Sequence, residues 1–183
     1  RDIVDQYFCL GDMVQYGNSF DENRCVELVQ RNQCLTVRGN HEDKVLANYQ
    51  QSLKKMYPQN LDYLASLSSS LVIEPQYFLV HAPSGQRIIS DAQAGEEFSK
   101  LPLGVEICFF GHSHQPSLFS KDKKGRVKKE RLGEGATFLR EGSQYLINPG
   151  GVGLYWGLPQ TYLLFDSNSR KLQFRRIDPA NTS

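Results

Sequence analysis

The sequence predicts an α/β fold with two sheets, and two observations favour it. In the first half, short apolar runs at Tyr7–Leu10 and Cys34–Val37 flank a segment with helical spacing, which is typical of a strand-helix-strand unit. After His114 the chain is rich in short β-like segments, and the last two, Thr161–Asp166 and Lys171–Ile177, flank a Ser-Asn-Ser turn. We therefore expect a first sheet with parallel strands and a second sheet that is more antiparallel.

The other elements are predicted from capping residues and hydrophobic spacing. Ser19-Phe20-Asp21-Glu22 has the form of a capping box that opens a helix. On that helix Cys25, Leu28 and Val29 have the spacing of one buried face. The remaining expected elements are helices near Glu42–Met56 (ended by Pro58) and Leu61–Leu67, a strand at Tyr77–Val80, a helix from Ser90 or Asp91 to about Lys100, and strands at Ile107–Phe110, Ser117–Lys121, Arg126–Leu132 and Tyr145–Asn148.

Length and composition indicate a single domain over residues 1–183. The chain has 183 residues, of which 39% are hydrophobic, and a formal net charge of +1, which suits one domain with a substantial core. No apolar run approaches the roughly 20 residues that cross a bilayer, and Arg1-Asp2-Ile3-Val4 has no signal-peptide layout. We expect a cytoplasmic protein with no membrane contact and with four free, buried thiols: Cys9, Cys25, Cys34 and Cys108.

One segment, Lys121–Arg131, is strongly basic. It holds seven basic and two acidic residues, with Gly125 near its middle. A solvated hairpin tip is the simpler interpretation, and a contact for an anionic substrate or partner is the alternative.

Side chains that bind metals recur where the predicted strands end. Ligands of open α/β sheets bind at the carboxyl ends of strands, and imidazole is the commonest protein metal ligand. All four histidines of the chain belong to this set, although a hydrogen-bonded structural role is the alternative for any one of them. In an extended segment, the last two would share a face because they stand two residues apart. The candidates, strand by strand, are Asp12, Asn40 with His41, His81, and His112 with His114.

Four motifs, taken in order, resemble the calcineurin-like metallophosphoesterase superfamily: Gly11-Asp12, Gly39-Asn40-His41-Glu42, His81 and Gly111-His112-Ser113-His114. Finer features in residues 11–17, 37–41, 148–153 and 174–176 resemble its small prokaryotic phosphodiesterase and phosphatase branch. The resemblance implies a two-sheet β-sandwich of mixed sheets flanked by helices. It covers essentially the whole chain.

The resemblance also implies roles for the candidate residues. Asp12 would bridge two divalent metal ions, and His114 would bind the first of them. Asn40, His81 and His112 would complete the shell of the second, while His41 would act as the catalytic proton donor. Nitrogen and oxygen ligands without thiolate suit Mn, Fe, Zn, Co or Ni, and we favour manganese.

Two segments beside these motifs allow two interpretations each. Arg38 could contact the substrate phosphate or form an ion pair that supports its loop. The glycine-rich segment Asn148–Gly153 could approach the metals closely because it lacks Cβ atoms, or it could serve only as a turn.

The chain departs from the superfamily pattern in two places. The Asp-x-His motif that supplies the remaining ligands of the first metal is missing, so we expect an N-terminally incomplete enzyme that lacks the first strand and helix, about 25 residues in all. Gln15 and Tyr16 stand where protein phosphatases of the superfamily carry an Asp and an Arg before Gly17. A phosphoprotein substrate is therefore disfavoured.

The leading functional hypothesis is a hydrolase that cleaves a small phosphomonoester, phosphodiester or nucleotide with a metal-activated water. A non-catalytic interaction scaffold on the same fold is the first alternative, because the Asp-x-His motif is absent. A nuclease that uses the basic segment on nucleic acid is the second and less favoured alternative. The sequence gives no indication of oligomeric state.

Overall fold

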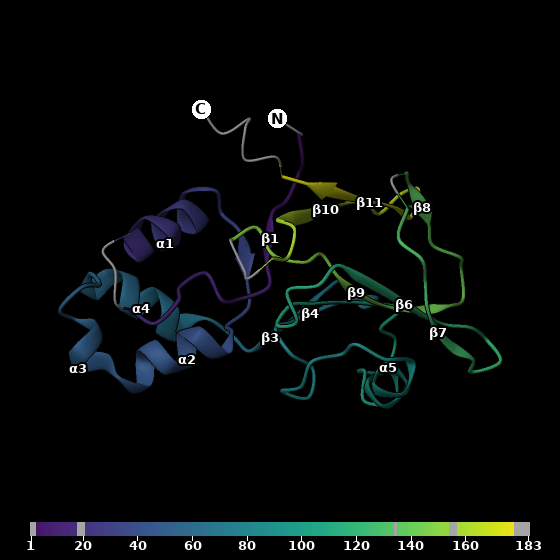
Figure 1. Ribbon diagram of the computed structural model, residues 1–183, viewed down its shortest axis with the longest axis horizontal. Coiled ribbons are helices and arrows are strands. Elements are labelled where there is room, and N and C mark those ends of the chain that lie inside the picture. Colours follow the sequence, from purple (N-terminus) through teal and green to yellow (C-terminus); the bar gives the residue numbers. More distant parts are fainter. Residues whose placement is uncertain (1–2, 18–20, 134, 154–156, 178–183) are drawn as a thin grey trace. The chain divides into compact units, whose positions relative to one another are not determined.

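The computed structural model describes residues 3–17, 21–133, 135–153 and 157–177, and it contains helices and mixed sheets (Figure 1). The chain forms two compact units. The first takes the chain up to Leu71 together with Leu79–His81, and the second takes Val72–Phe78 and the chain from Ala82 onward. The predicted α/β class with mixed sheets is confirmed.

The first unit contains the predicted strand-helix-strand arrangement and a group of helices. Strand β1 pairs in parallel with β2, with Phe8 opposite Leu35, and α1 connects them. The helix expected near Glu42–Met56 is two shorter helices, because Asn48 leaves the helical conformation with φ −111° and ψ 38°. Pro58 begins the last helix at a position where its missing N–H costs nothing. The elements are β1 (Phe8–Cys9), α1 (Asp21–Arg31), β2 (Leu35–Thr36), α2 (Asn40–Ala47), α3 (Tyr49–Ser52) and α4 (Pro58–Ser66).

The core of the first unit gathers side chains from α1, α2, α4 and the loop after β1. Its buried members are Val14, Val26, Val45, Met56, Leu61 and Leu64.

Helix α1 turns a different face to this core from the one its hydrophobic pattern predicts. Of the predicted face, Cys25 is exposed, Leu28 is 60% exposed and Val29 is half-buried, whereas Val26 is fully buried beside the polar residues Glu22 and Asn23. Asn23 donates to the Lys55 carbonyl at 2.8 Å and accepts the Tyr57 N–H at 2.8 Å. The prediction was wrong because hydrogen bonds bury polar side chains here. The first half of the predicted capping box, Ser19 and Phe20, lies outside the described residues.

The second unit is built on a six-stranded mixed sheet in the order β3-β4-β5-β9-β6-β7. Strands β5 and β9 run parallel, and β6 pairs antiparallel with both β9 and β7. The sequence predicted four of the six strands closely, placed β7 within a longer expected strand and missed β3. Strands β3 and β4 each contain residues of both units. The strands are β3 (Ser70–Ile73), β4 (Tyr77–Val80), β5 (Ile107–Phe110), β6 (Ser117–Lys121), β7 (Val127–Lys129) and β9 (Gln144–Asn148).

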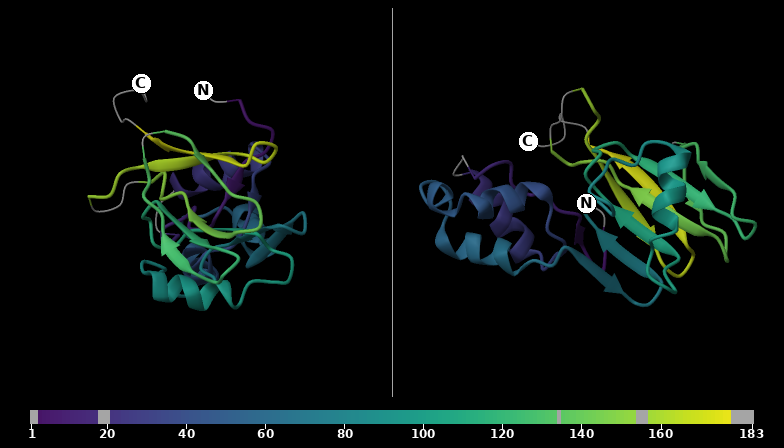
Figure 2. Two further views of the ribbon diagram at one scale, coloured as in Figure 1. Left: turned by 90° about the vertical axis from the view of Figure 1, so that its right-hand side faces the viewer. Right: turned by 90° about the horizontal axis from the view of Figure 1, so that it is seen from below.

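A three-stranded antiparallel sheet packs on one face of this sheet, and α5 (Asp91–Phe98) covers the other (Figures 1 and 2). The smaller sheet has the order β10-β11-β8. Phe165 of β10 contacts Tyr77 and Phe109, with ring centroids 5.6 Å and 5.5 Å away. All four residues of β5 are buried, as expected for a strand covered on both faces. The three strands are β8 (Thr137–Phe138), β10 (Thr161–Asp166) and β11 (Lys171–Arg176).

Aspartates hold the two predicted hairpin turns of the second unit. Asp166 accepts the N–H groups of Asn168 and Ser169 between β10 and β11. Asp122 accepts the N–H groups of Lys124 and Arg126 between β6 and β7, within the basic segment. The Arg126 hydrogen bonds lower the pKa of the exposed Asp122 carboxyl. The basic segment therefore forms the predicted hairpin, and its contact with an anionic substrate or partner stays a prediction.

Two further expectations can be compared with the structure. All four cysteines are free, but only Cys108 is buried; Cys9 and Cys34 are half-buried, and Cys25 is exposed. In the part of the chain that the structure describes, the helices are too short or too polar to span a bilayer.

The reassigned face of α1 can be tested by truncating one side chain on each face. We expect Val26→Ala to lower the free energy of unfolding by about 2 kcal/mol, because it removes two buried methyl groups and leaves a cavity. The exposed Leu28→Ala variant should stay within about 0.5 kcal/mol of wild type. Urea unfolding followed by circular dichroism measures both. Equal losses would contradict the structure, and a larger loss for Leu28→Ala would restore the face predicted from sequence.

Candidate metal centre

Two glycines allow three chain segments to approach one another where β1, β2 and β4 end. A Cβ atom on Gly11 would lie 2.7 Å from the Gly39 nitrogen and 2.9 Å from His81 Nδ1, and one on Gly39 would lie 2.6 Å from the Asp12 nitrogen. Gly11 also has φ +84°, a conformation that L side chains rarely adopt. Glycine is therefore required at both positions for this contact between loops.

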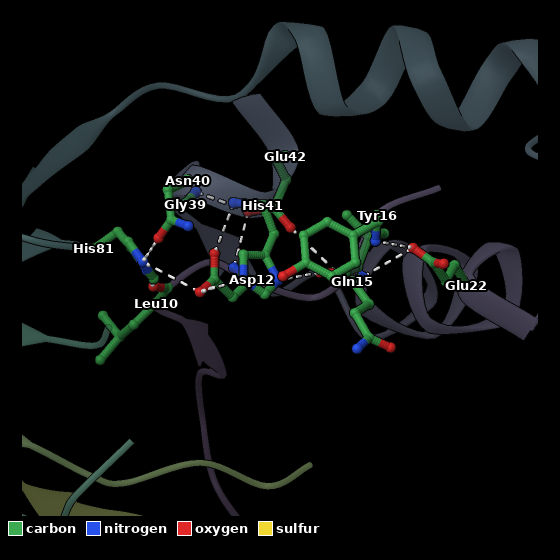
Figure 3. Close-up of polar contacts among 11 residues, drawn as sticks. Leu10, Asp12, Gln15, Tyr16, Glu22, Gly39, Asn40, His41, Glu42 and His81 are labelled. Atoms are coloured by element: carbon green, nitrogen blue, oxygen red, sulfur yellow. Dashed lines mark hydrogen bonds and ion pairs between the residues drawn. The ribbon is translucent and has the colours of Figure 1, made fainter. Parts of the chain in front are cut away.

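Asp12 lies at the centre of the group that forms at this point (Figure 3). Its φ of +57° is in the left-handed region, which is uncommon for a residue other than glycine and concentrates at functional sites. Its Oδ1 atom accepts the backbone N–H of His41 at 3.0 Å, and its Oδ2 atom lies 3.3 Å from His81 Nε2. The side chain is only 9% exposed.

His81 presents one ring nitrogen to this group and uses the other to fix its orientation. Its Nδ1 atom lies 2.7 Å from the Leu10 carbonyl oxygen, which can only accept a hydrogen bond, so Nδ1 carries the proton. In the neutral ring, Nε2 then carries a lone pair. This atom faces Asn40 Oδ1 at 3.0 Å as well as the Asp12 carboxylate (Figure 3).

The residues of this group fit a divalent cation. A carboxylate oxygen, an amide oxygen and an imidazole nitrogen converge, and all three are electron-pair donors that a shared cation would satisfy. The Leu10 carbonyl orients the imidazole as outer hydrogen-bond partners orient metal-bound histidines. Burial raises the pKa of the nearby Cys9 thiol to about 12. The structure thus brings Asp12, Asn40 and His81 together.

Glu42, the last residue of the Gly-Asn-His-Glu motif, is fully buried and holds the surrounding backbone in place. Its Oε2 atom accepts the N–H groups of Asp12 at 2.8 Å and Gly39 at 2.7 Å, and its Oε1 atom accepts that of Val14 at 3.2 Å. Burial raises the pKa of this carboxyl, and the nearby Asp12 charge raises it further. The three hydrogen bonds partly offset this rise. Glu42 is a positioning residue that sequence reasoning missed, although its place in the motif was a signal.

His41 lies beside the group in the first turn of α2. Its Nδ1 atom is 3.1 Å from the Val14 carbonyl oxygen, so Nδ1 again carries the proton. Its Nε2 atom lies 3.9 Å from Asp12 Oδ2, and its ring stacks on that of Tyr16 (Figure 3). The structure therefore brings His41 next to the candidate ligands, with Nε2 as the ring nitrogen nearer the Asp12 carboxylate.

Arg38 forms the ion pair that one of its two interpretations predicted. Its Nε atom lies 2.9 Å from Asp43 Oδ1, and its backbone N–H donates to the Ser68 carbonyl. The guanidinium thus supports its own loop in the structure, while a contact with substrate phosphate stays a prediction.

The second unit carries the other two candidate ligands on the loop after β5. His112 and His114 have φ values of +64° and +58°, so the expectation of an extended segment was wrong. The Ser113 N–H donates to the Gly111 carbonyl at 2.7 Å, which tightens the turn between the histidines. A Cβ atom on Gly151 would lie 3.7 Å from His114 Nδ1, which places the glycine-rich loop beside this histidine.

Asn148 joins these two loops of the second unit and is another residue whose role the sequence did not reveal. Its buried amide group donates to the Gly111 carbonyl and to Ser113 Oγ, and its Oδ1 atom accepts the Gly150 N–H at 2.8 Å. Gly150 has φ +85°, and a Cβ atom there would overlap Thr161 Oγ1. The glycine-rich segment is therefore a constrained turn tied to the histidine loop.

A mixed sheet packed on an antiparallel one, and Asp, Asn and His side chains at strand ends, are the features of a metallophosphoesterase-like protein. The chain belongs to the calcineurin-like phosphoesterase superfamily: the family model described as "Calcineurin-like phosphoesterase superfamily domain" matches residues 1–170. Metal-dependent hydrolysis of phosphate esters is the chemistry that this membership implies.

Particular relatives are similar over most of the chain. An uncharacterized protein of Methanocaldococcus jannaschii, MJ0912, is 31% identical over 195 residues, covering 96% of this chain and 76% of that protein. A metallophosphoesterase from Sphaerobacter thermophilus superposes with a TM-score of 0.80 at 24% identity, covering 96% of this chain and 79% of that one. The hypothetical protein PH1004 from Pyrococcus horikoshii OT3 has a TM-score of 0.67 at 14% identity, with 96% and 76% covered. The two solved structures support the fold.

Because both carboxylate oxygens of Glu42 accept backbone N–H groups, replacing one of them should lower the free energy of unfolding. In Glu42→Gln at least one of the three N–H groups faces an amide NH₂ instead of an acceptor, which should cost about 1–3 kcal/mol. Urea unfolding in the presence of EDTA measures this cost without any contribution from bound metal. Glu27→Gln, an exposed substitution on α1, is the matched control, and a Glu42 variant as stable as this control would contradict the assignment.

Asn148 generates a similar prediction for the second unit. Asn148→Asp replaces a donor by a charged acceptor that faces the Gly111 carbonyl, so we expect a loss of about 3 kcal/mol in the free energy of unfolding. The Gly150 N–H keeps an oxygen acceptor in this variant, so the loss reports on the donor side of the Asn148 amide. The exposed turn residue Asn168 offers the control, since Asn168→Asp should change stability by less than about 0.5 kcal/mol. A stability equal to that of the Asn168→Asp control would show that the Asn148 amide does not join the loops.

Proposed function

We propose that this protein is a metal-dependent phosphohydrolase that cleaves a small phosphomonoester, phosphodiester or nucleotide. Membership of the calcineurin-like phosphoesterase superfamily supports the reaction class. One observation carries the proposal for this chain: His81 Nε2 faces both Asp12 Oδ2 and Asn40 Oδ1, while its Nδ1 proton is committed to a carbonyl. A divalent cation satisfies all three donors at once.

The proposed ligand set has two parts with different support. Asp12, Asn40 and His81 are supported by their mutual geometry within the first unit. The assignment of His112 to the second metal and of His114 to the first rests on the order of the motifs in the sequence. Two cations are proposed, with Asp12 as the bridging ligand and manganese as the favoured metal.

Bound cations would activate a water as nucleophile and neutralise charge on the phosphate oxygens. The chain's own residues supply the rest. His41 holds a proton on Nδ1 against the Val14 carbonyl, which leaves Nε2 to hold the proton that is passed to the leaving oxygen. Glu42 keeps the Asp12 and Val14 backbone fixed while this happens.

The loop after Asp12 argues for a small substrate. It carries Gln15 and Tyr16 in place of the Asp and Arg that accompany phosphoprotein hydrolysis in related enzymes, so we do not propose a phosphoprotein substrate. The basic β6–β7 hairpin is a secondary candidate for contact with nucleic acid. A cytoplasmic location stays a prediction.

The proposal predicts that Asp12→Asn weakens metal binding and lowers hydrolysis together. Calorimetric titration with MnCl₂ should show weakened binding, and hydrolysis of p-nitrophenyl phosphate and of its bis-ester in Mn²⁺ should fall at least about 100-fold. The exposed α4 residue provides the control Asp62→Asn, which should match wild type. An Asp12→Asn protein that still hydrolyses these esters at the wild-type rate would overturn the site assignment.

The same experiment separates the enzyme from a scaffold. Wild-type protein that binds Mn²⁺ tightly but hydrolyses none of these esters would favour the non-catalytic alternative. Hydrolysis restricted to polynucleotides, with binding that weakens steeply as salt rises, would favour a nuclease.

A further inference from the structure

Tyr16 is an exposed aromatic side chain that packs on the proposed proton donor. Its ring is stacked on that of His41, with centroids 5.1 Å apart and planes inclined by 27°. Lys44, one turn further along α2, places its Nζ atom 5.2 Å from the centre of the same ring. Since Tyr16 is 46% exposed, burial alone gives little reason for an aromatic residue at this position.

The loop that carries Tyr16 is held by a second carboxylate. Glu22 of α1 accepts three successive backbone N–H groups with Oε2, from Gln15 at 2.8 Å, Tyr16 at 3.2 Å and Gly17 at 2.9 Å. Figure 3 shows Glu22 beside the first two of these residues. Gly17 has φ +67°, and a Cβ atom there would lie 2.9 Å from Ser52 Oγ. The loop backbone is thereby fixed independently of the Tyr16 side chain, so the ring is presented to His41 from a rigid support.

Two constraints of different kind act on the imidazole. The hydrogen bond from Nδ1 to the Val14 carbonyl fixes the tautomer and restrains rotation about the Cβ–Cγ bond, because Nδ1 lies off that axis, but at 3.1 Å it still accepts a range of ring angles. Stacking against a flat ring restricts that rotation, because tilting the imidazole would open the contact between the two faces. The direction of Nε2 depends on the ring plane, and general-acid transfer depends on that direction.

We propose that Tyr16 is a positioning residue for His41. Its ring fixes the plane of the imidazole, so that Nε2 is directed at the leaving oxygen of the substrate, while the Val14 carbonyl fixes the tautomer. The catalytic consequence rests on the proposed phosphohydrolase function. The structural part, the orientation of His41 by Tyr16, does not depend on it.

The first test reads the imidazole directly in metal-free protein. With only four histidines in the chain, the ring signals of His41 can be assigned by comparison with His41→Gln in long-range ¹H–¹⁵N spectra. Tyr16→Leu should remove the ring-current shift of the His41 ring protons and speed exchange of the Nδ1 proton. Tyr16→Phe should retain both features. Tyr57→Leu, which removes a tyrosine that is 45% exposed elsewhere in the first unit, should leave the His41 signals unchanged.

The second test uses the leaving group, because a proton donor matters most when the departing oxygen is basic. For phenyl phosphate, Tyr16→Leu should lower kcat about 10-fold or more with little change in KM, whereas for p-nitrophenyl phosphate the loss should stay under about 3-fold. Tyr16→Phe should restore kcat for the poor leaving group. Tyr57→Leu should match wild type on both substrates.

The outcomes distinguish this inference from the proposed function. Equal losses of kcat for both leaving groups, or failure of Tyr16→Phe to restore activity, would overturn the positioning role in catalysis. Unchanged His41 signals in Tyr16→Leu would show that Tyr16 does not orient the His41 ring. If wild-type protein hydrolyses no ester, the proposed function fails, and the spectra alone decide whether Tyr16 orients His41.

Discussion

The buried carboxylate of Glu42 is the interaction on which the site in the first unit depends. It ties the loop after β1, through the N–H groups of Asp12 and Val14, to the N–H of Gly39 that precedes α2. Desolvating a carboxylate is expensive, and three backbone donors offset that cost only if they converge within hydrogen-bonding distance. The glycines follow from the same requirement, since a side chain at Gly39 would occupy the space of the Asp12 carboxylate.

In the second unit, a neutral side chain holds two loops together. Asn148 both donates and accepts, so one amide joins the Gly111 carbonyl to the Gly150 N–H without burying a charge. In each unit, then, one buried polar side chain fixes a loop in which predicted ligands take left-handed φ values: Asp12 in the first unit, and His112 and His114 in the second. Strain of this kind persists only when surrounding contacts hold it.

The sequence predicted those parts of the fold in which hydrophobic pattern and burial agree. Strand β5 has the predicted bounds, because each of its residues is apolar and each is buried. The face of α1 could not be predicted, because hydrogen bonds bury Glu22 against the preceding loop and Asn23 against a segment 32 residues away, and hydrophobic spacing encodes neither contact. For the site, ligand types at strand ends were readable, whereas the acceptor role of Glu42 and the left-handed turn of the histidine loop depend on tertiary contacts.

The contacts of Arg38 bear on how the protein could hold a phosphate. Its ion pair with Asp43 joins two partly exposed side chains, 31% and 63% accessible, and such pairs contribute at most about 1 kcal/mol. A phosphate dianion forms stronger, charge-assisted hydrogen bonds with a guanidinium than one carboxylate oxygen at the surface does. The two interpretations of Arg38 are therefore compatible: Asp43 orients the side chain in the absence of substrate, and the exchange of partners costs little free energy.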